Sequence, residues 1–316
     1  MLGSMPRGCR QARRLVYEGY RPEDEPLREA LCTLGNGVFA TRGAAPESRA
    51  DGIHYPGTYR IGLYNRQSTT IGGTTVENES LVHLPDWLEV AFRVDDGEWF
   101  EPAGAELLEY RQELDLREGI LFRRIRFRQD GRTTRLTQRR LVSMAAPHLA
   151  ALETTWEAED WSGSLRVRAG LDGWVENGGV ERYRRLEGSH LAPVEARAVD
   201  DETLFLLVRT LQSAIRIAEA ARVRVFRDGE ALRPPRDVRE EEAYVAHELD
   251  LELDEGKEVT VEKVVCLRTS LDHALSESGL EARKGVRRAG TFQALLEAHR
   301  LAWHHVWRRA RIRIGG

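Results

Sequence analysis

The chain has 316 residues, of which 41% are hydrophobic and 31% are charged, and its formal net charge at pH 7 is −4. This composition can form one large all-β domain or two smaller domains, and it provides no basic surface for nucleic acid or an anionic membrane. Cys9, Cys32 and Cys266 are far apart and form no Cys-x-x-Cys motif. This spacing argues against a disulfide framework or a zinc site and favours a reducing, cytoplasmic environment.

The N-terminal region contains one motif that needs an unusual backbone conformation. Residues 1–14 are predicted to form a disordered or frayed tail, because they lack the apolar run of a signal peptide or a membrane span. Residues 18–43 contain an apolar run that is interrupted by Gly35-Asn36-Gly37. Glycine and asparagine tolerate positive φ, so this segment predicts a strand, a tight turn and a second strand. A dinucleotide-binding motif would need a third glycine opening a helix, which Val38-Phe39-Ala40 does not supply.

Between Leu88 and Arg268 the apolar residues alternate with polar ones at a period of two. This pattern, with Asp-Gly turns, predicts a series of hairpins in a large antiparallel β-sandwich. No repeat of fixed length is present, which argues against a propeller. His247 falls on the apolar face of the clearest strand and is expected to be a hydrogen-bonded core residue. The expected turns are Asp96-Gly97, Asp130-Gly131, Asp172-Gly173, Asp228-Gly229 and Glu255-Gly256.

The hydrophobic period changes to that of a helix near the C-terminal end. Ser270 could cap a short helix from Leu271 to about Leu280, followed by a charged link over residues 281–289. Apolar residues then recur at steps of three and four, which predicts an amphipathic helix from Thr291 to about Arg309. Its two tryptophans have no evident partner, so this helix either folds back on the sandwich or presents a face to something else.

Two segments of this chain resemble the opening of family 65 of the glycoside hydrolases and phosphorylases. These enzymes act on α-linked glucose disaccharides such as maltose, trehalose and kojibiose. The residues that carry the resemblance are Glu18-Gly19-Tyr20, Leu34-Gly35-Asn36-Gly37, Arg42-Gly43 and the run Leu81-Val82-His83-Leu84-Pro85-Asp86-Trp87.

The resemblance implies a mainly β fold with a defined domain order. We expect a galactose mutarotase-like supersandwich over residues 15–269 and a helical linker over residues 270–316, leading to an (α/α)6 barrel that these residues do not include. In the family, the general-acid glutamate and the phosphate-binding residues lie in that barrel. No catalytic residue can therefore be assigned to this chain. The parent enzyme would need no metal or organic cofactor, would use inorganic phosphate as co-substrate, and could form a homodimer.

Two loop segments, residues 52–66 and 77–88, are the candidates for contact with a sugar. Sugar rings stack on aromatic side chains, while polar neighbours bind the hydroxyl groups. The alternative for the same residues is internal packing of long loops. Glu77 and Glu79, which flank Asn78, are candidates for a partly buried polar network. The predicted sugar-facing residues are Tyr59, Tyr64, Asn65, His83, Asp86 and Trp87, with Tyr55 in the same loop.

The functional expectation is the N-terminal domain of an α-glucoside phosphorylase or hydrolase. By itself the domain would be non-catalytic and would support or wall the active site of a barrel, in cis or in trans. Two alternatives stay open, namely a stand-alone carbohydrate-binding module and a subunit that docks a separately encoded barrel. The choice of disaccharide, and of phosphate or water as acceptor, would belong to the barrel.

Overall fold

The structure is a computed structural model that describes residues 13–178 and 186–310. The predicted N-terminal tail, with Cys9, lies outside the described residues apart from Arg13 and Arg14, and Arg14 already begins the first strand. The helices are α2 (Glu25–Leu31), α3 (Ser278–Arg288) and α4 (Phe292–Arg309). The strands are β1 (Arg14–Glu18), β2 (Leu34–Gly35), β3 (Phe39–Thr41), β4 (Thr58–Arg60), β5 (Tyr64–Ile71), β6 (Thr74–Leu81), β7 (Val90–Val94), β8 (Glu106–Asp115), β9 (Ile120–Gln129), β10 (Arg132–Val142), β11 (Leu149–Ala158), β12 (Gly163–Asp172), β13 (Leu191–Ala198), β14 (Thr203–Thr210), β15 (Arg216–Arg227), β16 (Glu230–Leu232), β17 (Arg236–Glu241), β18 (Tyr244–Leu253) and β19 (Glu258–Thr269).

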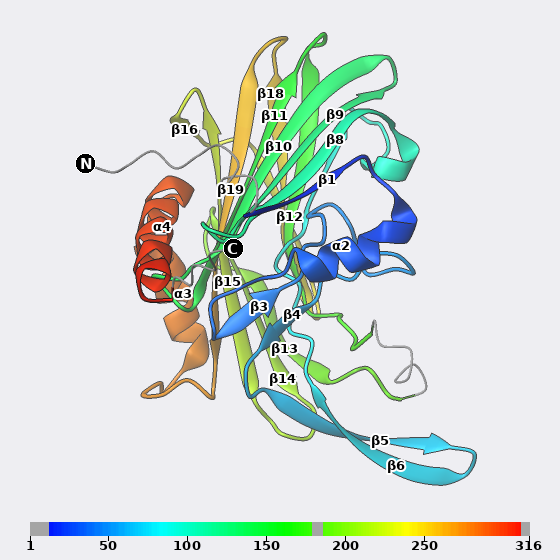
Figure 1. Ribbon diagram of the computed structural model, residues 1–316, viewed down its shortest axis with the longest axis vertical. Coiled ribbons are helices and arrows are strands. Elements are labelled where there is room, and N and C mark those ends of the chain that lie inside the picture. The colour runs from blue at the N-terminus through cyan, green and yellow to red at the C-terminus, as the bar shows by residue number, and fades with distance from the viewer. Residues whose placement is uncertain (1–12, 179–185, 311–316) are drawn as a thin grey trace, which may run out of the picture.

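The prediction of a large antiparallel sandwich is confirmed. One sheet of ten strands runs in the order β1-β8-β9-β10-β11-β19-β15-β14-β13, with β16 paired to β15 (Figure 1). A second sheet has the order β17-β18-β12-β7. Inward-facing side chains of both sheets, such as Phe92, Trp156, Val167 and Val261, form one buried cluster. The period-two alternation therefore has a direct cause, because every second residue of these strands is removed from water.

Two of the predicted Asp-Gly hairpin turns are confirmed. Asp130-Gly131 joins β9 to β10, and Asp228-Gly229 joins β15 to β16. In both turns the aspartate and the glycine have positive φ, which matches the twist of the flanking strands.

Two other predicted hairpins are wrong. Asp172-Gly173 follows β12, whose partners are β7 and β18. Glu255-Gly256 connects β18 of the small sheet to β19 of the large sheet, so this turn crosses between the layers. Alternation identifies a strand but not its partner, because strands of both sheets bury every second residue against the same core.

The Gly-Asn-Gly motif forms the predicted tight turn, between β2 and β3. Gly37 has a φ of +84°, and the Asn36 side chain accepts from the backbone N–H groups of Val38 and Phe39. The residues before the turn differ from expectation, since residues 25–31 form helix α2 rather than a strand. Pro26 lies in the first turn of this helix, where a missing N–H costs nothing.

Helix α3 begins later than predicted. The Ser270 hydroxyl accepts from the Arg216 N–H of β15, so it is not available as a helix cap. Glu277 caps α3 instead, by accepting from the N–H groups of Gly279 and Leu280. The predicted charged link is therefore wrong, because most of it lies within α3.

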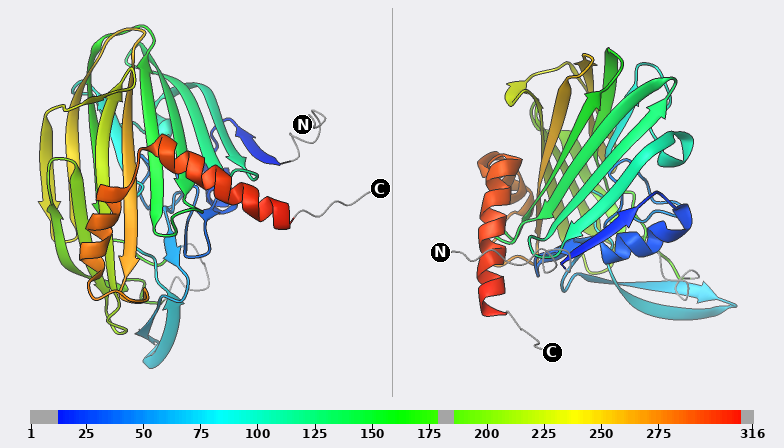
Figure 2. Two further views of the ribbon diagram at one scale, coloured as in Figure 1. Left: turned by 90° about the vertical axis from the view of Figure 1, so that its left-hand side faces the viewer. Right: turned by 45° about the horizontal axis from the view of Figure 1, so that its top comes forward.

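Helix α4 is confirmed, with Thr291 as its N-cap. Both C-terminal helices cover the outer face of the large sheet, on the side opposite α2 (Figures 1 and 2). Phe292, Leu295 and Leu296 of α4 pack on Ile120 and Val264.

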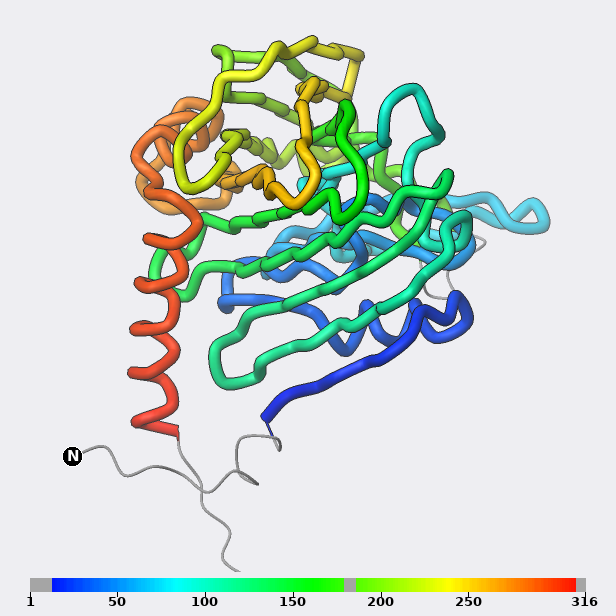
Figure 3. Tube along the Cα trace, turned by 90° about the horizontal axis from the view of Figure 1, so that it is seen from above, coloured from blue at the N-terminus to red at the C-terminus, as the bar shows by residue number. Residues whose placement is uncertain are grey.

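The tryptophans of α4 have partners within the chain, which supports the first of the two alternatives that the sequence left open. Trp303 lies against Gly119, where an added Cβ would come within 2.4 Å of the indole nitrogen. The Trp307 indole donates to the Arg117 carbonyl at 2.7 Å. His299 is buried nearby and donates from Nε2 to the Glu118 carbonyl. The helix therefore folds back on its own sandwich and runs along one side of it (Figure 3). Among the described residues, we find no helix with the length and hydropathy needed to cross a bilayer.

Candidate functional site

The first candidate loop contributes to an aromatic group that we name the tyrosine cluster: Tyr55, Tyr59 and His83. The two tyrosine hydroxyls are 2.6 Å apart. The His83 ring lies 4.9 Å from the Tyr55 ring and 5.6 Å from the Tyr59 ring, measured between centroids. Burial lowers the pKa of His83 to about 4, so this imidazole is neutral at pH 7.

Residues 174–178, which follow β12, cover the tyrosine cluster. The Glu176 carbonyl accepts from the Tyr55 hydroxyl and from Nδ1 of His83. The Asn177 side chain accepts from the His83 N–H and donates to the Leu81 carbonyl. A third segment, which the sequence did not point to, thus brings together the two loop segments. Its Glu176 lies 121 residues after Tyr55, and its Asn177 lies 94 residues after His83.

The six predicted sugar-facing residues divide by burial. Trp87 is fully buried and donates to the Thr41 hydroxyl, while Asn65 accepts from the backbone N–H of Gln212 and Ser213. Asn65, His83, Asp86 and Trp87 are all buried. These contacts favour internal packing for these four, since a side chain without exposed surface cannot stack on a sugar.

Tyr59 and Tyr64 retain exposed surface. Tyr64 is 46% exposed at the base of the β5–β6 hairpin, which extends away from the sandwich (Figure 1). Contact with a sugar stays a prediction for these two residues. Trp174, which the sequence did not single out, is 57% exposed in the segment next to the tyrosine cluster. Glu77 and Glu79 are exposed on the same hairpin, so their expected partly buried network is wrong.

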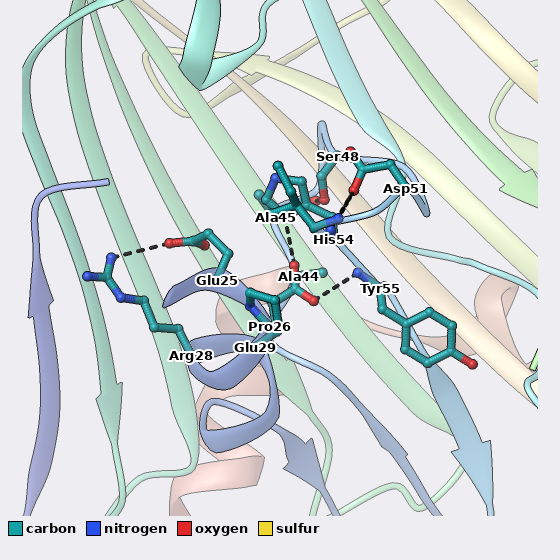
Figure 4. A network of polar contacts seen from close by, with 12 residues as sticks. Glu25, Pro26, Arg28, Glu29, Ala44, Ala45, Ser48, Asp51, His54 and Tyr55 are labelled. Atoms are coloured by element: carbon teal, nitrogen blue, oxygen red, sulfur yellow. Dashed lines mark hydrogen bonds and ion pairs between the residues drawn. The ribbon is translucent and has the colours of Figure 1, made fainter. Parts of the chain in front are cut away.

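Contacts of Glu29 and Arg42 hold the loop that carries Tyr55 in place. The two oxygens of the buried Glu29 carboxylate bond His54 Nδ1 and the Tyr55 N–H, each at 2.9 Å (Figure 4). Arg42 donates to the carbonyls of Tyr55 and Pro26. Burial acts to lower the pKa of His54, but the hydrogen bond and charge of Glu29 outweigh it and raise that pKa.

Gly43, the glycine of the Arg-Gly motif, lies where Cys32 approaches the backbone closely. A Cβ at this position would lie 2.5 Å from the Cys32 Cβ and 3.0 Å from its carbonyl oxygen. The end of α2 could not pack here against a larger residue. The Arg42-Gly43 motif therefore has a structural role, because it attaches the end of α2 to the loop that carries Tyr55.

A second polar group, which we name the core charge cluster, consists of Asp86, Glu89, Glu219 and Lys263. All four residues are at most 7% exposed. The Lys263 ammonium donates to the backbone carbonyls of Glu89 and Gly170. The Glu89 carboxylate accepts from the Tyr244 hydroxyl at 2.7 Å. The sequence contained a signal for this cluster, because Lys263 and Glu219 interrupt the inward-facing apolar positions of β19 and β15.

Burial shifts the pKa values of this cluster strongly. It raises the pKa of Asp86 to about 7 and the pKa of Glu219 well above its usual value. It lowers the pKa of Lys263 to about 8. A carboxylic acid that is protonated at neutral pH can serve as a general acid. Both acids, however, lie in the core: Glu219 has no exposed surface and Asp86 is 7% exposed.

The raised pKa of Asp86 predicts a specific pH dependence. Between its ordinary pKa of 3.8 and the folded value of about 7, the unfolded chain loses this proton first, so the stability of the wild type falls as pH rises. In Asp86→Asn this loss is absent. We expect the free energy of unfolding of Asp86→Asn, relative to the wild type, to rise by on the order of 3 kcal/mol between pH 4 and pH 8.

Urea unfolding at several pH values measures this difference. Asp254→Asn is the matched control, since Asp254 is exposed, and its difference from the wild type should not change over the same range. Parallel pH profiles for Asp86→Asn and the wild type would show that Asp86 does not titrate in this way.

The profile of the family described as "Glycosyl hydrolase family 65, N-terminal domain" matches residues 15–306. The chain belongs to this family. The resemblance inferred from the two motifs is confirmed, and so is the β-sandwich that it implied.

Known relatives of this family 65 domain are much longer proteins. An uncharacterized glycosyl hydrolase of Mycobacterium tuberculosis (strain CDC 1551 / Oshkosh) is 44% identical over 303 residues, which cover 96% of this chain and 23% of the relative. A kojibiose phosphorylase of Halothermothrix orenii is 27% identical over 92% of this chain and 36% of its own length. A solved structure from the human microbiome, provisionally named a kojibiose phosphorylase, aligns with a TM-score of 0.80 at 18% identity, over 93% of this chain and 38% of the other. The chain thus spans 23% to 38% of the length of these relatives.

Proposed function

We propose that this chain is the N-terminal domain of an α-glucoside phosphorylase or hydrolase, and that it supports or walls an active site carried by an (α/α)6 barrel. The observation that carries this proposal is the match of residues 15–306 to the family's N-terminal domain, in a chain that covers only a fraction of each relative. The remainder of those relatives is long enough to hold a separate catalytic domain.

The electrostatics of the described residues support a non-catalytic role for the chain by itself. Inverting cleavage of a glycosidic bond needs an acid at the leaving oxygen and space for the attacking group on the opposite face of the sugar. Asp86 and Glu219, whose pKa values are raised most clearly, lie in the core and not beside such a space. The chemistry is therefore assigned to the barrel, in cis or in trans.

The same proposal implies a substrate class and a cellular location for the parent enzyme. It would cleave an α-linked glucose disaccharide, with inorganic phosphate as co-substrate in a phosphorylase and without a metal or organic cofactor. Cys32 and Cys266 are buried free thiols, as expected of a cytoplasmic protein. Tyr64 and the β5–β6 hairpin, which extends from the body of the sandwich, are the parts proposed to meet the substrate side of the barrel (Figure 1).

The direct test is an assay of the purified chain with kojibiose, trehalose and maltose, each with and without inorganic phosphate. We expect no glucose and no glucose 1-phosphate above the blank. Release of either product by this chain would contradict the non-catalytic role.

A carbohydrate-binding module is the second candidate, and the exposed side chains of Tyr64 and Trp174 favour it. Titration with the same disaccharides distinguishes the two. Saturable binding that is lost in Tyr64→Ala or Trp174→Ala, but kept in a variant of the exposed Leu301, would support the module. The third alternative, a subunit that docks a separate barrel, loses its main support because α4 packs on its own sheet. Co-purification of a helical subunit would restore it.

A further inference from the structure

A cavity of about 810 Å³ lies at the rim of the sandwich, on elements that the tyrosine cluster does not use. The turn between β13 and β14, strands β15, β17 and β18, and helix α3 contribute to its wall. Its most distinctive feature is positive charge. Five arginines line it: Arg222, Arg224, Arg233, Arg236 and Arg287.

Two of these guanidinium groups are free to bind a ligand. Arg233 and Arg287 are exposed, and within the described part of the chain neither forms an ion pair. Arg224 uses only its Nε in the contact with Glu202. Arg236 donates one N–H to the Val223 carbonyl. Arginine presents several N–H donors in a planar fork, which suits the oxygens of a phosphate group.

His247 adds an independent sign of a ligand. It lines the cavity and is 1% exposed, and neither ring nitrogen has a hydrogen-bond partner among the described residues. The sequence predicted a hydrogen-bonded core histidine, so that part of the prediction is wrong. Burial lowers the pKa of His247 to about 4, and the neutral ring therefore offers one donor and one acceptor at pH 7. Buried polar atoms without partners are costly, which makes an occupant of the cavity favourable.

Acidic side chains also line the cavity, so it contains negative as well as positive charge. Asp200, Asp201 and Glu202 belong to the turn between β13 and β14 and line the same space. Arg222 is already engaged by three backbone carbonyls, so the other four arginines face three carboxylates, and an anion is favoured overall. Carboxylates are acceptors only, and they would bind hydroxyl groups of the same ligand.

We propose that this cavity binds a small phosphate ester that carries hydroxyl groups, of the sugar phosphate class. The phosphate would lie among Arg224, Arg233 and Arg287, and the hydroxyl groups would meet His247 and the acidic turn. This site is separate from the active site proposed for the barrel, and the inference stands whether or not that proposal is correct.

Isothermal titration calorimetry on the full chain tests the proposal, with glucose 6-phosphate as the probe. Inorganic phosphate and glucose are the comparison ligands. We expect saturable binding of glucose 6-phosphate, weaker binding of inorganic phosphate and no binding of glucose. The double variant Arg233→Ser/Arg287→Ser should weaken glucose 6-phosphate binding by about tenfold or more, because two charge-assisted contacts are lost.

The matched control is Arg308→Ser/Arg309→Ser, which removes the same charge from the end of α4 and should bind as the wild type does. The imidazole NMR signals of His247, assigned with His247→Gln, should shift on addition of glucose 6-phosphate. Thermal unfolding of each variant checks that the fold is intact. No binding of glucose 6-phosphate, equal binding of inorganic phosphate, or equal weakening in both double variants would overturn the proposal.

Discussion

Replacing Lys263 by methionine is expected to lower the free energy of unfolding by about 3 to 5 kcal/mol at pH 7. Lys263 is fully buried and donates to the carbonyls of Glu89 and Gly170. Its charge also lies close enough to Asp86 and Glu219 to lower the pKa of each. Methionine fills a similar volume but leaves the two carbonyls without this donor, and it leaves the partly ionised Asp86 without a nearby cation.

Urea unfolding measures this loss, and Lys257→Met is the matched control. Lys257 is exposed in the turn before β19, so the same substitution there should change stability by less than about 0.5 kcal/mol. Adding Asp86→Asn to Lys263→Met should restore part of the stability, because the pKa of Asp86 is about 7 and its partly ionised carboxyl group interacts with Lys263. A Lys263→Met protein as stable as Lys257→Met would mean that the core charge cluster does not depend on its cation.

Replacing Arg222 by methionine is expected to cost about 3 kcal/mol and to loosen the two C-terminal helices. The Arg222 side chain is buried and donates to three carbonyls where α3 ends and α4 approaches: Val286, Ala289 and Gly290, each at 2.7 to 2.8 Å. These carbonyls would have no donor in the variant. Glu262, which accepts from the Phe292 N–H, would lose its nearby cation.

Urea unfolding and amide hydrogen exchange over residues 278–309 measure the effect of Arg222→Met. Arg224→Met is the control, because Arg224 is the next outward-facing residue of β15 and is about one third exposed. We expect faster exchange in α3 and α4 for Arg222→Met only. Equal stability and equal exchange in the two variants would show that the helices are held by apolar packing alone.

By itself, the sequence determined the mainly β fold class, the family and helix α4. These features depend on local patterns. Alternating residues such as Val223 and Val225 face the core in any antiparallel sandwich, and Thr291 caps the helix that follows it directly. The motif of Gly35-Asn36-Gly37 also predicts its turn, because the asparagine side chain bonds the two N–H groups next to it.

Only the tertiary structure decided which strands pair, which polar residues are buried and which meet in one place. β18 and β19 are adjacent in the chain yet belong to different sheets, and Ser270 is unavailable as a cap because it bonds a residue of β15. Asn65, Asp86 and Trp87 are buried by contacts with segments elsewhere in the chain. Lys263 and Glu219 meet in the core, and His247 meets the arginines of α3 and β17, for the same reason. Such contacts join residues that are far apart in sequence, so their energies appear only once the chain has folded.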